Sequence, residues 1–177
     1  MNEKLKFRLP TAEDAAEYIS YRQAFLDAGS SMDGTGPMRR TPDPMEWLAI
    51  NAQYADPATV PEGKVQSTQF VCERVSDGRI VGMLQVRLAL NDFLLHYGGH
   101  IGYSVRPAER QHGYAIQMLR LTLEKAREHG IEKVRICCDH YNVASAKTIR
   151  ANGGVLEDEC FDSSDGTLTQ RYWIQNK

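Results

Sequence analysis

The strongest constraint on the fold comes from a stretch in the second half of the chain, where the period of the hydrophobic pattern changes twice. Residues 99–105, GHIGYSV, indicate a strand. Apolar side chains then recur at helical spacing from Gly113 to Gly130, and residues 133–140, KVRICCDH, indicate a second strand. A strand, a helix and a strand in this order make a crossover connection, which lets two strands of one sheet run parallel. This unit therefore predicts an α/β fold with a parallel crossover in its C-terminal half.

The segments around this unit predict a sheet that is otherwise antiparallel. Two apolar runs separated by SDG indicate a hairpin, and two C-terminal strands meet at SSDG. Helix-start signals place helices after Thr11 and Asp43, and Asn142 can cap a short third helix. With a first strand at 5–9, the order predicts a mixed, mostly antiparallel sheet of about seven strands with flanking helices. We expect one domain that spans residues 1–177.

The composition is that of a soluble globular protein, and we expect neither a nucleic acid nor a membrane as partner. The 177 residues are 42% hydrophobic and 25% charged, and the net charge is −2. No apolar run approaches the ~20 residues that span a bilayer, and the N-terminus lacks the apolar stretch of a signal peptide. The four cysteines have no metal-binding spacing. We therefore expect reduced thiols, no metal site and a cytoplasmic location.

The loop between the first strand of this unit and its helix carries positive charge where the helix dipole already places some. Arg106, Arg110 and His112 lie just before Gly113, at the start of the helix. The first amides of a helix have no partner inside it and can bind phosphate oxygens, so a bound anion is one explanation. A strand-to-helix turn with solvated basic side chains is the other. The loop is neither a P-loop nor a GxGxxG dinucleotide fingerprint.

The stretch VRPAERQHGYA resembles the acetyl-CoA loop of the GNAT acetyltransferases, whose pattern is Gln or Arg, two residues, Gly, any residue, and Gly or Ala. Arg110, Gly113 and Ala115 meet that pattern here. The strand HIGYSV is similar to the family's central strand, often written Glu-Ile-Gly-Tyr. The likeness covers roughly residues 70–175, and the order of elements agrees with the GNAT fold.

A second stretch, NVASAKTIRANGG, is similar to a later family segment, Asn-x-x-Ser followed after six to eight residues by Lys-x-Gly-Phe. Asn142, Ser145 and Gly153 match it in spacing, whereas Ala151 and Gly154 stand where the family has lysine and phenylalanine. The serine pattern is closest to the N-acetyltransferases of ribosomal proteins. Two motifs in the correct order favour this family over a nucleotide- or phosphate-binding domain that uses the first loop alone.

The resemblance implies that acetyl-CoA is the acyl-donor cosubstrate and that no metal takes part. The loop amides would hold the pyrophosphate, with Arg110 reinforcing them. Pantetheine would run along the strand at Ser104 and Val105 like an added strand. The implied cofactor-binding residues are Ser104, Val105, Arg110, Gln111, His112, Gly113, Tyr114, Ala115 and Asn142.

The resemblance leaves the acid and the base to be assigned. Many family members use a tyrosine seven residues after the asparagine as the acid, but that position is Ile149 here. Ser145 is the substitute we expect, and the alternative is that it caps a helix three residues after Asn142. His100 stands where the glutamate of Glu-Ile-Gly-Tyr would stand. An imidazole with a pKa near ~6.5 could take a proton from ammonium, and the alternative is a polar residue at a sheet edge.

Together these features predict a GNAT-type acetyltransferase that moves acetyl from acetyl-CoA to a primary amine on a small molecule or a peptide. Arg39 and Arg40, in the loop before the second helix, are candidates for binding a carboxylate on the acceptor. The alternative is a non-catalytic module that binds acyl-CoA as a sensor or regulator, because the tyrosine is absent and NGG departs from the family pattern. Exchange of the C-terminal strands between subunits would make a homodimer.

Overall fold

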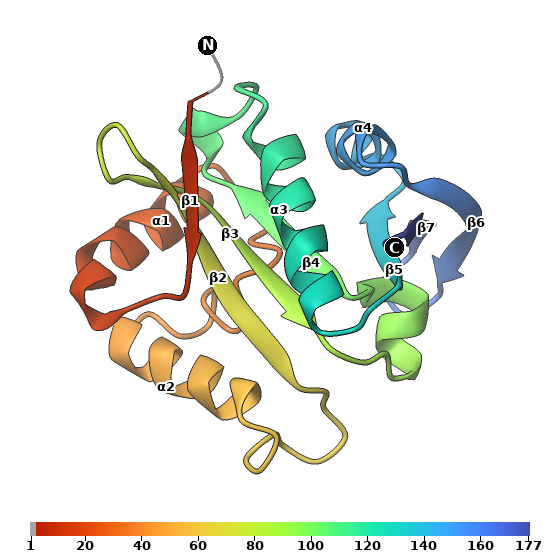
Figure 1. Ribbon diagram of the computed structural model, residues 1–177, viewed down its shortest axis with the longest axis horizontal. Coiled ribbons are helices and arrows are strands. Elements are labelled where there is room, and N and C mark those ends of the chain that lie inside the picture. Colours follow the sequence, from red (N-terminus) through yellow and green to blue (C-terminus); the bar gives the residue numbers. More distant parts are fainter. Residues whose placement is uncertain (1–2) are drawn as a thin grey trace.

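The computed structural model describes residues 3–177 and contains the helices and strands that the sequence predicts (Figure 1). In chain order they are β1 (Leu5–Arg8), α1 (Ala15–Asp27), α2 (Pro44–Ala55), β2 (Ser67–Arg74), β3 (Ile80–Arg87), β4 (Ile101–Val105), α3 (Tyr114–Glu128), β5 (Lys133–Asp139), α4 (Val143–Ala151), β6 (Val155–Asp162) and β7 (Thr167–Gln175). Three short helical turns lie between them: η1 (Ala12–Asp14), the π-helical η2 (Leu94–Gly98) and η3 (Pro107–Glu109). Of these, η2 has no counterpart among the sequence predictions. None of the helices within residues 3–177 combines the length and the apolar character that a membrane span requires.

The seven strands form two antiparallel sheets instead of one continuous sheet. The strand orders are β1-β2-β3-β4 and β5-β7-β6. The prediction that the crossover joins two parallel, paired strands is wrong, because β4 and β5 form no ladder within the described residues. An isolated antiparallel bridge between Gly99 and Ile136 joins the two sheets at one end. Beyond this bridge both strands line one cavity, so the space that a ladder would take is open.

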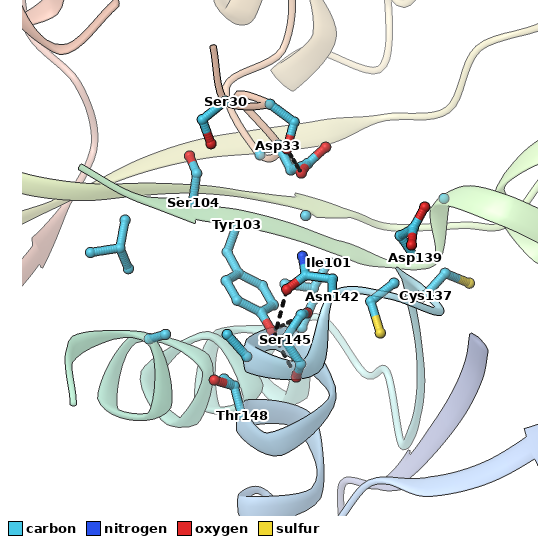
Figure 2. Close-up of a pocket in the computed structure, with 18 of the residues that line it drawn as sticks. Ser30, Asp33, Ile101, Tyr103, Ser104, Cys137, Asp139, Asn142, Ser145 and Thr148 are labelled. Carbon is cyan, nitrogen blue, oxygen red and sulfur yellow. Dashed lines mark hydrogen bonds between the residues drawn. The ribbon is translucent and has the colours of Figure 1, made fainter. Parts of the chain in front are cut away.

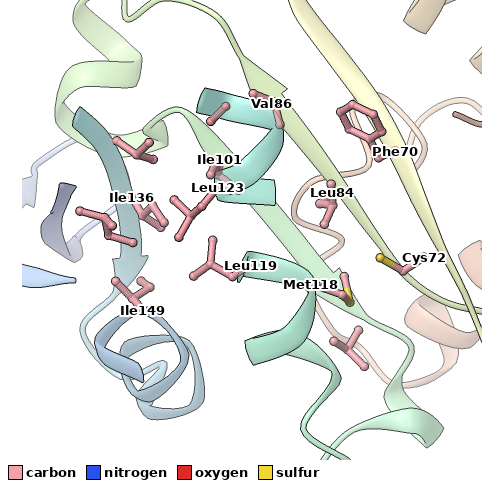
Figure 3. Packing of buried hydrophobic residues seen from close by; sticks show 14 of the residues in the cluster. Phe70, Cys72, Leu84, Val86, Ile101, Met118, Leu119, Leu123, Ile136 and Ile149 are labelled. Atoms are coloured by element: carbon pink, nitrogen blue, oxygen red, sulfur yellow. The ribbon is translucent and has the colours of Figure 1, made fainter. Parts of the chain in front are cut away.

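The helices cover opposite faces of the four-stranded sheet. Alternate side chains of β3 reach different cores, since Leu84 packs with α3 whereas Met83 packs with α1 and α2. The first core continues past the opening between the sheets (Figure 3). Leu119 of α3, Ile136 of β5 and Ile149 of α4 all belong to the same buried cluster as Leu84. Packing on α3 therefore holds the two sheets together where their strands do not pair.

Local capping signals explain where two of the helices begin. Asp43 Oδ1 accepts a hydrogen bond from Met45 N at 2.8 Å, and Asn142 Oδ1 accepts one from Ser145 N at 3.0 Å. The start of α3 is different, because its N-cap is Gly113 in the left-handed conformation and has no side-chain cap. The first amides of α3 are therefore left for another partner.

The loop between α1 and α2 packs directly on β4. Gly34 in this loop has a φ of 71°, and an added Cβ would lie 2.6 Å from Tyr103 Cα and closer still to the carbonyl of Gly102. The neighbouring Thr35 is buried, and its carbonyl accepts a hydrogen bond from Trp47 Nε1 at 2.7 Å. The loop is thus fixed between the sheet and α2.

Candidate active site

A cavity of about 1160 Å³ occupies the opening between β4 and β5. It is lined on both faces of β4 (Figure 2). Tyr103, Ser145 and Thr148 lie on the side of α4, whereas Asp33 and Ser104 lie on the side of the α1–α2 loop. The loop before α3 also lines it. One chamber therefore joins the loop that resembles an acetyl-CoA site to a second surface on the opposite face of the sheet.

The turn before α3 lines this cavity with residues whose backbone amides have no partner inside the helix. Gly113 has a φ of 79° and Gln111 a φ of 66°, so two residues of the loop adopt the left-handed conformation. That conformation is costly for Gln111, which has a Cβ. The hydrogen bond from Gln117 N to Gly113 O begins the helix, so the amides of Tyr114 and Ala115 come before it. These amides and the helix dipole suit a phosphate group.

The two arginines of the loop are largely engaged with the protein itself. Arg106 is buried, and its Nη2 lies 3.0 Å from Glu17 Oε2 on α1. Arg110 lines the cavity, and its Nε donates to Val105 O at 3.2 Å while its Nη2 donates to Ser30 Oγ at 2.8 Å. Arg106 therefore anchors α1, and Arg110 closes the loop over the cavity while leaving its charge beside it.

The side chains of two predicted cofactor-binding residues, His112 and Ser104, form hydrogen bonds or close contacts within the protein. His112 does not line the cavity, and its Nδ1 lies 3.1 Å from Glu109 O. Ser104 does line it, but its hydroxyl is 3.1 Å from Tyr21 OH, which also donates to Ser104 O at 3.0 Å. The side chains of His112 and Ser104 therefore make contacts within the protein, and their part in binding acetyl-CoA stays a prediction about the backbone of the loop and of β4.

Along β4, every second residue directs its backbone N–H and C=O groups away from β3, toward the unpaired edge of the strand. Arg106 N donates to Val81 O at 2.8 Å, and hydrogen-bonded pairs alternate along antiparallel strands. Ser104 consequently directs its backbone groups toward β3, whereas those of Tyr103 and Val105 face the opening. An added strand would pair with Val105 as predicted, and with Tyr103 in place of Ser104.

Tyr103 and Ser145 form a hydroxyl pair between β4 and α4. Tyr103 OH and Ser145 Oγ are 2.8 Å apart (Figure 2). The capping role belongs to Asn142, which accepts from the backbone amide of Ser145 and so leaves the serine hydroxyl to Tyr103. Burial raises the pKa of Tyr103, although the hydrogen bond with Ser145 acts the other way, so the phenol is protonated at neutral pH. Ile149, at the position of the family tyrosine, is buried in the core.

His100 does not lie where a catalytic base is needed. Only 8% of its surface is exposed, it sits where the two sheets meet, and it does not line the cavity. Its Nδ1 accepts a hydrogen bond from Arg135 N at 2.9 Å. Burial, together with the charges of Arg87 and Arg135, lowers the pKa of His100 to about 4. The expected base at His100 is therefore corrected to a neutral, structural histidine.

The face of the cavity toward the α1–α2 loop carries charged residues that the sequence patterns do not single out. Arg87 ends β3 and Asp33 lies in the α1–α2 loop, and both line the cavity. Arg39 and Arg40, the predicted carboxylate binders, lie outside the lining, and Arg39 donates to Ser30 O. The sequence signal for Arg87 is a charge at the end of a mostly apolar strand, IVGMLQVR. Within residues 3–177, no three side chains of the metal-binding types gather into one group.

Comparison with known proteins relates this geometry to a family. A family model described as "Acetyltransferase (GNAT) domain" matches residues 4–155. Comparison with curated proteins gives no match. Among solved structures, the ribosomal-protein-S5-alanine acetyltransferase from Vibrio fischeri is similar over 99% of this chain and 94% of its own, with 18% identity and a TM-score of 0.75.

Two further solved structures are similar at the same level. RimJ from Mycobacterium smegmatis, in complex with a CoA disulfide, is covered over 81% of its length by 96% of this chain, with 19% identity and a TM-score of 0.71. The protein yncA from Salmonella typhimurium, with acetyl-CoA, is covered over 94% by 98% of this chain, with 17% identity and a TM-score of 0.64. At these identities the likeness concerns the fold, and it agrees with the predicted similarity to ribosomal-protein acetyltransferases. Since the family model spans β1 to α4, the chain belongs to the GNAT acetyltransferase family.

Proposed function

We propose that the protein transfers an acetyl group from acetyl-CoA to a primary amine. The observation that carries this proposal is the single cavity that joins the start of α3 at Gly113 to charged side chains on the opposite face of the sheet. Acetyl transfer requires the thioester and the amine to meet in one place, and the opening between β4 and β5 provides it. The similar structures that hold CoA or acetyl-CoA support the same use of the loop here.

The residues present fit the cosubstrate. The amides at the start of α3 suit the pyrophosphate, and the position of a Cβ on Gly113 has no neighbour within 4 Å. The outward-facing backbone groups of Tyr103 and the amide of Val105 suit the amides of pantetheine, whereas Val105 O accepts a hydrogen bond from Arg110. When bound, acetyl-CoA supplies an activated acetyl group and a thiol as leaving group.

We infer that the Tyr103–Ser145 pair delivers the proton that the leaving thiolate needs. The pair lines the cavity on the side of α4, and both hydroxyls are protonated at neutral pH. Ser145 is the predicted acid, Tyr103 can return a proton to it through their 2.8 Å hydrogen bond, and the proton released by the attacking amine restores the phenol of Tyr103. Tyr103 thus supplies a phenol although Ile149 has replaced the family tyrosine.

Calorimetric titration with coenzyme A, followed by thiol release from acetyl-CoA in the presence of an amine panel, tests the proposed function. We expect binding, with a rise in melting temperature at saturating coenzyme A, and turnover on at least one class of amine. Binding without turnover on any amine would favour the acyl-CoA sensor. Absence of binding at millimolar coenzyme A would refute the assignment of the loop.

Replacing Ser145 with alanine tests the proton donor. We expect kcat to fall by ~10²-fold or more, the usual contribution of an acid, with little change in the affinity for coenzyme A. Tyr103→Phe should also lower kcat. The kcat of the double variant should be only slightly lower than that of Ser145→Ala, because the two hydroxyls act as a unit. Ser76→Ala, on the exposed turn of the β2–β3 hairpin, is the matched control. Full turnover in Ser145→Ala would assign proton delivery to another group.

A small-molecule or peptide acceptor, a homodimer and a cytoplasmic location stay predictions from the sequence. Gel filtration with light scattering tests the dimer, and the amine panel separates small-molecule from peptide acceptors.

A further inference from the structure

Arg87 is a half-buried cation with unused hydrogen-bond donors. Its Nη1 donates to Gly98 O at 3.0 Å and to Gly99 O at 3.1 Å. Within residues 3–177, its Nε and Nη2 donate to no protein acceptor, and no carboxylate lies within 4 Å of it. The two most deeply buried arginines, Arg106 and Arg135, each have an ion-pair partner. Arg87 therefore differs from them in having its charge directed at a cavity instead of at a carboxylate.

The two carbonyls fix the guanidinium at the wall of that cavity. Nη2 lies beside Gly102, 3.2 Å from the place that a Cβ would occupy, so the glycine keeps the space in front of the guanidinium free. Arg87 lies four residues after Met83 in β3, so their side chains are on the same face of the sheet, and that of Met83 packs toward α1 and α2. The guanidinium thus faces the side of the sheet opposite to the Tyr103–Ser145 pair.

Asp33 supplies a negative charge on the same side. Its Oδ2 accepts a hydrogen bond from Ser31 Oγ at 2.8 Å, and Oδ1 accepts none from residues 3–177. Asp33 and Arg87 both line the cavity and form no ion pair. Burial lowers the pKa of Arg87, and the negative charge of Asp33 acts in the opposite direction. The cavity wall therefore holds a cation at Arg87 and an exposed anion at Asp33 that form no ion pair with each other.

We propose that Arg87 binds a carboxylate of the acceptor and that Asp33 receives its ammonium group, so that the acceptor is a free amino acid or a similarly small zwitterion. This inference rests on the proposed function and names the acceptor class for that site. The guanidinium fork matches a carboxylate, and its fixed orientation lowers the entropy lost on binding. A polyamine or a protein N-terminus without a nearby carboxylate would leave the cation of Arg87 facing another cation in a partly desolvated site.

The experiment compares ligands that differ in the carboxylate alone. Glycine and the eighteen protein L-amino acids that have a primary α-amine are titrated calorimetrically into protein saturated with coenzyme A. The α-amide of each, the amine left by its decarboxylation, and spermidine are titrated in the same way. Thiol release from acetyl-CoA is then measured with the same compounds. The variants are Arg87→Gln, which removes the charge, and Arg87→Lys, which keeps it without the fork. Arg40→Gln, an exposed arginine outside the cavity lining, is the matched control.

For at least one amino acid we expect wild-type protein to bind the acid about 10- to 100-fold more tightly than its amide, the range for a hydrogen bond between charged groups. Arg87→Gln should abolish that preference, Arg87→Lys should keep part of it, and Arg40→Gln should keep all of it. Affinity for coenzyme A should be unchanged in the three variants, which separates loss of the carboxylate contact from damage to the turn at Gly98 and Gly99.

The inference would be overturned if amides or spermidine bind as tightly as every amino acid, or if the preference survives in Arg87→Gln. An equal loss of kcat for all acceptors in Arg87→Gln, with affinities unchanged, would overturn it in favour of a role in the chemical step. These outcomes leave coenzyme A binding and turnover on other amines intact, so they differ from a failure of the proposed function itself.

Discussion

Replacing Gly34 with alanine should destabilise the protein through two separate effects, both visible in the contact between the α1–α2 loop and β4. The first is conformational. Gly34 has a φ of 71°, and a left-handed backbone costs a residue with a Cβ ~1–2 kcal/mol. Alanine also restricts the unfolded chain, which offsets ~0.4–1 kcal/mol of that loss. The conformational part of the destabilisation is therefore about 1 kcal/mol.

The second effect is steric. A Cβ on Gly34 would lie 2.6 Å from Tyr103 Cα and closer to the Gly102 carbonyl, whereas unbonded carbons pack best at ~3.5–4.0 Å. Both neighbours are backbone atoms of β4 and cannot rotate away, so the loop and the strand must separate by about 1 Å or more. Overpacking of this kind costs ~1–3 kcal/mol, which brings the expected loss to ~2–4 kcal/mol.

Gly29→Ala separates the two effects. Gly29 belongs to the same loop and has a φ of 57°, but an added Cβ there meets no atom within 4 Å. The free energy of unfolding of Gly29→Ala should therefore fall by the conformational part alone, about 1 kcal/mol. Equilibrium unfolding in urea measures both variants, and the affinity for coenzyme A should fall in Gly34→Ala alone, because Gly102 and Tyr103 line the cavity.

Equal free energies of unfolding for the two variants, within ~0.5 kcal/mol, would refute this reasoning. Such a result would mean that the loop yields without moving β4, and that the close approach of Gly34 to the strand does not position the cavity wall.

Three other perturbations probe features outside that contact. His100 has its pKa lowered to about 4 by burial, so the stability it contributes is fully present above pH ~6.5 and is lost as the pH falls toward 4, with a slope approaching ~1.4 kcal/mol per pH unit. His100→Asn, which can still accept from Arg135 N, should flatten that slope in urea unfolding between pH 7 and pH 4, and an unchanged slope would contradict the assignment. Gln111→Gly should relieve the left-handed backbone at φ 66° and raise the thermal midpoint by a few degrees or less; a lower midpoint would show that the glutamine side chain stabilises the loop. Arg106→Met should cost ~1–3 kcal/mol because Glu17 loses its ion pair and, among the described residues, keeps only the amide of Ile80 as hydrogen-bond donor, and adding Glu17→Gln should recover part of that loss; a purely additive double variant would argue against a coupled pair.

The elements of the fold could be predicted from sequence because their signals are local. The change of period on either side of Gly113 and the caps at Asp43 and Asn142 each act within a few residues, and the structure has them where they were expected. The opening between β4 and β5 could not be predicted in this way. Whether two strands on either side of a crossover pair or diverge depends on packing between α3 and both sheets, and no local pattern records it.

The candidate site shows the same division. The glycine loop was identified from its own residues, whereas the contact of Ser145 with Tyr103 joins positions far apart in the sequence. Alternation predicted the face of β4 on which Tyr103 lies, but not what it meets there. His100 was assigned from a family position, and its role changed because that position lies where the sheets touch and Arg135 occupies its Nδ1. A charge at a strand end is usually solvated, so the position of Arg87 in the sequence does not predict that it lines the cavity.

Because the edge of β4 is unpaired, the resistance of the protein to local unfolding and proteolysis should depend on bound cosubstrate. Outward-facing amides such as that of Val105 lack a partner strand, so they should exchange with deuterium faster than the amides paired with β3. A bound acetyl-CoA would cover the facing edges of β4 and β5 together. It would add ~2.7 kcal/mol to the free energy of unfolding at a concentration 100 times its Kd. Resistance to proteolysis should therefore follow the supply of activated acetyl groups, and the protein would be shortest-lived when its substrate is scarce.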